Sequence, residues 1–155
     1  MLVCLKTQNS KLKTQNDIMT QSLSNQQVAQ WISVCSLDRI LPNTGVCALV
    51  NGEQIAVFRI GRSEVEQSET VYAISNYDPF SKAQVLSRGI VGDSRRDRST
   101  NRNGIPKVAS PIYKQNFSLL TGQCLDDESV SVLTYPVQVV DGQVQIGIIN
   151  QSSES

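Results

Sequence analysis

The chain has 155 residues, enough for one domain with a substantial hydrophobic core. Its 14 Lys and Arg residues balance its 14 Asp and Glu residues, so its overall charge draws it neither to nucleic acid nor to a membrane. The absence of histidine removes the usual acid–base group near neutral pH and any Ser-His or Cys-His pair, which disfavours a self-contained enzyme.

Residues 1–30 are dominated by Gln, Asn, Ser, Thr and Lys. Such a segment buries too little apolar surface to offset its ordering entropy, so we expect a disordered N-terminal extension, with a short helical turn at 24–30. The apolar start is too short for a signal peptide and no apolar run approaches a membrane helix, so a cytoplasmic location is expected. Four cysteines without a Cys-x-x-Cys pair predict buried thiols at Cys35, Cys47 and Cys124 and a mobile thiol at Cys4.

From residue 31 the pattern is that of short strands separated by turns. Residues 31–35 predict an opening strand, and residues 36–41 a helical turn or loop. Asn51-Gly52 then predicts a tight hairpin between strands at 46–50 and 54–59, because both residues tolerate positive φ.

A polar loop at 64–69 precedes a strand at 71–74, and residues 86–91 lead into the most charged stretch of the chain. Six basic residues lie between 87 and 107, against two acidic ones: Arg88, Arg95, Arg96, Arg98, Arg102 and Lys107, with Asp93 and Asp97. The stretch is interpreted either as a solvated hairpin loop or as a contact for an acidic partner surface. No aromatic residue separates the arginines, which weakens a nucleic-acid interpretation.

Residues 108–122 predict two strands joined by a tight loop at Ser110-Pro111 and closed by a turn at Thr121-Gly122. Strands are also expected at 130–135, 137–140 and 144–148, the last pair joined by Asp141-Gly142, before a flexible tail at 150–155. The acidic turn at 126–128 lacks the distributed oxygens of a calcium site. The pattern as a whole predicts an all-β, antiparallel sandwich or barrel.

Two of the predicted loops resemble the two halves of a Rieske iron–sulfur motif. In that motif Cys-x-His ends one loop and Cys-Pro-x-His ends the other; here the four ligand positions hold Asn76, Asp78, Ser110 and Tyr113. A Rieske [2Fe–2S] centre needs two thiolates and two imidazoles. Since the chain has no histidine, its composition excludes that cofactor.

Over residues 31–147 the chain resembles the small subunit of assimilatory NAD(P)H nitrite reductase, most specifically in the runs at 76–80 and 85–89. The resemblance implies a Rieske-like domain at 31–149 with a small subdomain that carries the two loops. It also implies an accessory role in reducing nitrite to ammonium, with no catalytic or metal-binding residue in this chain. The expected partner is the large subunit, with FAD, sirohaem and a [4Fe–4S] cluster. The alternatives are a free-standing, metal-free protein-binding module and a ferredoxin-type carrier, which the missing ligands disfavour.

The four ligand-position residues can all form hydrogen bonds, so one interpretation is that they hold the two loops together, with one of them capping a turn. The rival interpretation is a docking surface for the large subunit, because aromatic side chains at a loop tip are plausible contact anchors. Tyr77 or Phe80 could instead fold inward as core. The predicted interface comprises Tyr77, Pro79, Phe80, Arg88, Ile112, Tyr113 and Lys114.

Overall fold

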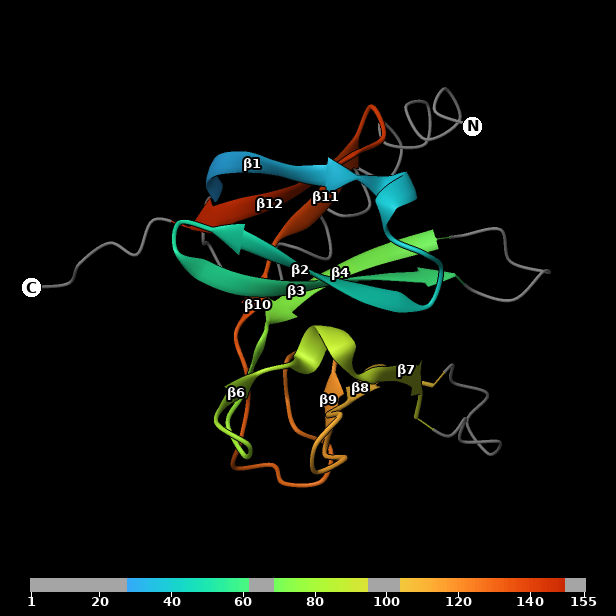
Figure 1. The fold of residues 1–155 in the computed structure, drawn as a ribbon, viewed down its shortest axis with the longest axis vertical. Helices are drawn as coiled ribbons and strands as arrows, with labels where there is room; N and C mark the ends of the chain where they lie inside the picture. The colour runs from blue at the N-terminus through green and yellow to red at the C-terminus, as the bar shows by residue number, and fades with distance from the viewer. Residues whose placement is uncertain (1–27, 62–68, 95–103, 150–155) are drawn as a thin grey trace, which may run out of the picture. The chain divides into compact units, whose positions relative to one another are not determined.

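The computed structural model describes residues 28–61, 69–94 and 104–149, and within them it contains antiparallel strands and two short 3-10 turns (Figure 1). The predicted all-β fold is therefore confirmed. The described chain divides into two compact units, one formed by residues 28–39 and 136–149 and the other by Ile40–Tyr135. The first strand begins at Val28, three residues before the predicted domain boundary at 31.

The first unit is a three-stranded sheet with the order β1-β12-β11. It contains β1 (Val28–Ser36), a 3-10 turn (Leu37–Arg39), β11 (Val137–Val140) and β12 (Gln143–Ile149). The predicted turn at Asp141-Gly142 joins β11 to β12, with φ of 51° and 76°. The predicted helical turn at 24–30 is wrong for residues 28–30, which are part of strand β1, because Val28 and Gln30 pair with Ile149 and Ile148 of β12. Residues 24–27 lie outside the described part.

The second unit contains a four-stranded sheet with the order β10-β4-β3-β2. Its strands are β2 (Thr44–Val50), β3 (Glu53–Gly61), β4 (Glu69–Ser75) and β10 (Thr134–Tyr135). Asn51 and Gly52 form the predicted hairpin turn, with φ of 51° and 82°. Glu69 opens β4 rather than ending the predicted loop, whose residues 62–68 lie outside the described part.

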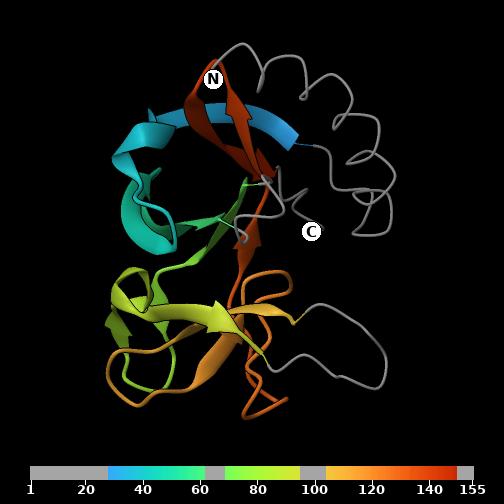
Figure 2. The ribbon, with the colours of Figure 1, turned by 90° about the vertical axis from the view of Figure 1, so that its right-hand side faces the viewer.

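Short strands and turns complete the second unit (Figure 2). They are β5 (Tyr77–Asp78), β6 (Ala83–Gln84), a 3-10 turn (Leu86–Arg88), β7 (Ile90–Asp93), β8 (Pro106–Ala109) and β9 (Asn116–Ser118). Their core residues Leu86, Val108 and Phe117 are fully buried and pack with Phe58 and Ile74 of the four-stranded sheet in one hydrophobic cluster. This cluster fixes where the loops begin and end.

The predicted strand at 130–135 is correct only for Thr134 and Tyr135. The preceding residues bond instead to the turn after β9: the Cys124 amide donates to the Val130 carbonyl, and the Val132 amide to the Gly122 carbonyl. Gly122 has a φ of 74° and no room for a side chain against the Val132 carbonyl. Close packing on that turn thus replaces a regular strand pair.

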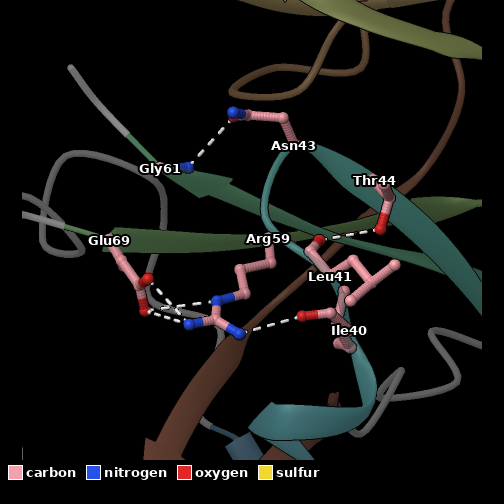
Figure 3. A network of polar contacts seen from close by, with 7 residues as sticks. All are labelled: Ile40, Leu41, Asn43, Thr44, Arg59, Gly61 and Glu69. Atoms are coloured by element: carbon pink, nitrogen blue, oxygen red, sulfur yellow. Dashed lines mark hydrogen bonds and ion pairs between the residues drawn. The ribbon is translucent and has the colours of Figure 1, made fainter. Parts of the chain in front are cut away.

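An arginine clamp joins the start of the second unit to its sheet (Figure 3). The Arg59 guanidinium donates to both carboxylate oxygens of Glu69, with Nη2 2.7 Å and 2.9 Å from them, and through Nη1 to the Ile40 carbonyl at 3.0 Å. Beside it, the Asn43 Oδ1 atom accepts a hydrogen bond from the Gly61 amide at 3.1 Å. These contacts hold the turn before β2 against the ends of β3 and β4.

The cysteine prediction holds for Cys124, which is fully buried, but is wrong for Cys47, whose side chain is exposed on the edge strand β2. Cys35 is partly buried, and Cys4 lies outside the described residues. No helix within the described ranges is long and apolar enough to cross a membrane. The arginine-rich stretch at 95–102 also falls outside them.

Candidate functional site: a loop tip joined by hydrogen bonds

The candidate site lies on two loops of the second unit, which we call the tip. The first tip loop, residues 76–88, leaves β4 and contains β5, β6 and the second 3-10 turn. The second tip loop, residues 110–115, links β8 to β9, and the Ser110 amide donates to the Gln115 carbonyl across its base at 2.8 Å. Regular strands therefore hold the ends of both loops.

A short hydrogen bond joins the two loops. The Ser110 hydroxyl donates to the Asp78 Oδ2 atom at 2.6 Å, and both residues are fully buried. The Ser81 hydroxyl donates to the same oxygen at 2.8 Å, and the Phe80 amide donates to Oδ1 at 2.9 Å. Both carboxylate oxygens are thus satisfied, so the charge can remain buried without a cation.

The pKa of Asp78 reflects this environment. Burial by itself would raise the pKa, but hydrogen bonds from Ser110, Ser81 and the Phe80 and Ser81 amides outweigh it and lower the pKa below 3.8. The carboxylate is therefore ionised at neutral pH. An ionised acceptor also strengthens the bond from Ser110, because charge-assisted hydrogen bonds are the stronger kind.

Asn76 anchors the first tip loop rather than bridging to the second. Its side-chain Nδ2 donates to the Gln54 Oε1 atom at 3.1 Å, and its Oδ1 accepts from the Ser87 amide at 2.8 Å. Nδ2 also lies 3.5 Å from the Cys47 Sγ atom. This buried amide joins the first tip loop to β3 and to the following 3-10 turn.

The four ligand-position residues thus separate into three kinds. Asp78 and Ser110 bridge the loops, Asn76 anchors one of them, and Tyr113 has a 61% exposed side chain with no hydrogen bond to the described residues. The bridging interpretation fits the first pair only. Tyr113 is free to serve a surface role.

The donor atoms of the tip do not fit an iron–sulfur cluster. The four positions offer an amide, a carboxylate, a hydroxyl and a phenol, whereas the cluster needs thiolates and imidazoles. The direct bond between Asp78 and Ser110 also takes up both side chains. Two cysteines lie elsewhere in the second unit. Cys47 contacts Asn76 from the edge strand β2, and the buried Cys124 belongs to the hydrophobic cluster.

The acidic turn at 126–128 is likewise engaged in local bonds. Asp126 accepts hydrogen bonds from the backbone and side chain of Asn116, at 2.6 Å and 2.9 Å, and these bonds lower its pKa. Asp127 accepts from the amide and hydroxyl of Ser129. Within the described ranges, no group of three or more Cys, Asp or Glu side chains is placed to hold a metal ion.

The outer surface of the tip is partly apolar and partly cationic. Tyr77 is 40% exposed and Ile112 47% exposed, and Lys82, Arg88 and Lys114 are exposed as well. Pro79 is partly buried. Phe80 turns inward, with its ring centroid 6.1 Å from that of Phe117 in the core. Of the two residues expected either to dock or to fold inward, Tyr77 is thus at the surface and Phe80 contributes to the core.

Two hydrogen-bond partners of these residues, Ser81 and Gln54, were not predicted from the sequence. Ser81 was recognisable in principle, because an aspartate followed three residues later by serine is typical of a side-chain-capped turn. Gln54, the partner of Asn76, carries no local signal because it lies 22 residues earlier in the chain. Such a contact emerges only when β3 and β4 pair.

The fold and the tip together define a Rieske-type domain whose ligand positions hold no cluster ligand. A family model for the Rieske-like [2Fe-2S] domain matches residues 30–147. The chain is 46% identical over 119 residues to the nitrite reductase (NADH) small subunit of Salmonella typhimurium, covering 77% of this chain and 98% of that protein. It belongs to the family of nitrite reductase small subunits.

Two further comparisons agree with this assignment. The NMR structure of the Escherichia coli protein NirD matches with a TM-score of 0.63 and 44% identity, covering 77% of this chain and 96% of that one. A nitrite reductase [NAD(P)H] large subunit of Klebsiella oxytoca is 38% identical over 117 residues, which are 76% of this chain and 11% of that protein. That large subunit thus contains a segment similar to this chain.

Proposed function

We propose that this chain is the accessory small subunit of a cytoplasmic NAD(P)H nitrite reductase and supports the reduction of nitrite to ammonium without a redox centre of its own. The observation that carries the proposal is the hydrogen bond between Asp78 and Ser110, which joins the loops at two positions where a Rieske protein holds its cluster. Electron transfer then falls to the large subunit, for which we expect FAD, sirohaem and a [4Fe–4S] cluster.

The large subunit is the expected partner. The Klebsiella large subunit contains a similar segment within its own chain, so in that protein such a domain is covalently attached to the rest of the large subunit. A separate small subunit would reach the same arrangement by binding. We propose that it binds through the tip, with Tyr77, Ile112 and Tyr113 as exposed contacts and Arg88 and Lys114 beside them; the partly buried Pro79 and Phe80 would shape the loop rather than touch the partner.

Co-purification tests this function. The chain is expressed with and without the large subunit from the same organism, and NADH-dependent nitrite reduction is assayed in both preparations. We expect a stable complex, and we expect the large subunit to lose activity or stability when this chain is withheld. No association and unchanged activity would refute the proposal and favour a free-standing binding module.

A further inference from the structure

Two lysines of the tip have an unusual backbone conformation. Five residues other than glycine have positive φ in the described chain, and three of them, Asn43, Asn51 and Asp141, are of types that tolerate it. The other two are Lys82, with φ of 54°, and Lys114, with φ of 66°. In this region the Cβ atom crowds the carbonyl oxygen, and lysine lacks the short polar side chain with which Asn and Asp form compensating local hydrogen bonds.

The two lysines come from different loops that the buried hydrogen bonds hold together. Lys82 follows Ser81, whose hydroxyl donates to Asp78, and the Lys114 amide donates to the Ser110 carbonyl at 3.1 Å. Because Ser110 in turn bonds to Asp78, the positions of both lysines depend on the same buried carboxylate. Strained residues persist where surrounding contacts over-determine them, and such residues cluster at functional sites.

The tip presents positive charge, although the whole chain is neutral. Its two loops contain three cations, Lys82, Arg88 and Lys114, all exposed, against the single carboxylate of Asp78, which is buried. Asp126 lies just beyond the second tip loop, and its carboxylate accepts hydrogen bonds from Asn116, which lower its pKa, with a smaller effect from the charge of Lys107. The Lys114 Nζ atom donates to the Pro111 carbonyl at 3.0 Å, which leaves two of its three donors available.

We infer that Lys82 and Lys114, one from each tip loop, are a pair of cationic anchors that contact an acidic surface of the large subunit, alongside Tyr77, Ile112 and Tyr113. This inference rests on the proposed function and specifies the chemistry of its interface. The pairing of rigid aromatic and apolar contacts with charges at their rim is typical of protein interfaces. Charges in such a rim mainly accelerate association and impose salt dependence.

Paired substitutions that are compatible with the positive φ of both positions test the inference. The double variant Lys82→Asn, Lys114→Asn removes both charges and places a residue that accepts positive φ at each site. The matched control, Lys82→Arg with Lys114→Arg, keeps both charges. Affinity for the isolated large subunit is measured by surface plasmon resonance at low and high salt, and melting by circular dichroism verifies that each variant is folded.

We expect the Asn pair to bind about tenfold more weakly at low salt, mostly through slower association, and to lose much of the salt dependence. The Arg pair is expected to bind like the unchanged chain. Equal binding by the Asn pair, or equal losses in both pairs, would overturn the anchor assignment while leaving the accessory function in place. If the unchanged chain itself fails to bind, the proposed function fails, and the assignment fails with it.

Discussion

Removing the Ser110 hydroxyl tests the central contact of the tip. Ser110→Ala deletes the donor that lies 2.6 Å from the Asp78 Oδ2 atom but keeps the Cβ atom, so almost no cavity forms. A hydrogen bond to a charged group contributes about 1.5–3 kcal/mol net. The Ile112 amide also loses its acceptor, but that hydrogen bond is long, at 3.3 Å, and only partly buried, so we expect its loss to add little. We therefore expect a loss of about 2 kcal/mol in the free energy of unfolding.

Ser81→Ala provides the matched control, because it removes the other hydroxyl that donates to the same Asp78 oxygen, at 2.8 Å. Ser81 is only partly buried, so water can substitute and the cost should stay below about 1 kcal/mol. Urea denaturation followed by circular dichroism measures both variants. A Ser110→Ala cost below about 0.5 kcal/mol, or one no larger than that of Ser81→Ala, would refute the reasoning.

Four further outcomes are expected. Because hydrogen bonds hold the pKa of Asp78 below 3.8, the stability that its carboxylate contributes is complete above that pH and is lost as the pH falls further. Ser110→Ala should raise this pKa and shift acid unfolding to higher pH. An unchanged acid-unfolding midpoint would contradict this. Burial, with the charge and hydrogen bond of Glu53, raises the pKa of Tyr135 to about 12. Ultraviolet titration should therefore show the Tyr135 phenol ionising there, and Glu53→Gln should lower its midpoint. Arg59→Ala should lower the free energy of unfolding by about 1–3 kcal/mol, and by more than Glu69→Gln does. The reason is that only Arg59→Ala also removes the hydrogen-bond donor of the Ile40 carbonyl. Equal losses in thermal melts would argue against the clamp. Phe80→Ala should lower the free energy of unfolding by about 2 kcal/mol because packing on Phe117 is lost, whereas Tyr113→Ala should change it by less than about 0.5 kcal/mol. A larger loss for Tyr113→Ala than for Phe80→Ala would contradict the assignment of Phe80 to the core and Tyr113 to the surface.

Local chemistry was enough to predict most of the fold. The turns at Asn51-Gly52 and Asp141-Gly142 follow from residues that tolerate positive φ, and the strands beside them from alternating side chains. Two of the wrong predictions depend on contacts outside the segment itself. Val28–Gln30 pairs with a strand more than a hundred residues away, whereas residues 130–132 bond to a nearby turn around Gly122 instead of extending β10.

The sequence predicted which two loops form the tip, but only part of the hydrogen bonding between them. The order of residues around Asn76 and Ser110 identified the two loops, and the hydrogen-bonding capacity of their side chains predicted a bridge. Which pair bridges depends on burial: Asp78 and Ser110 are fully buried, whereas Tyr113 is exposed. The left-handed backbone of Lys82 and Lys114 was not predicted, because lysine is not a residue type that favours it.

The most direct test of the docking tip is hydrogen–deuterium exchange of this chain, alone and bound to the large subunit. We predict slowed amide exchange in residues 76–88 and 110–115 of the complex, with little change in β11 and β12. Protection confined to other strands, with unchanged exchange in both tip loops, would contradict the account.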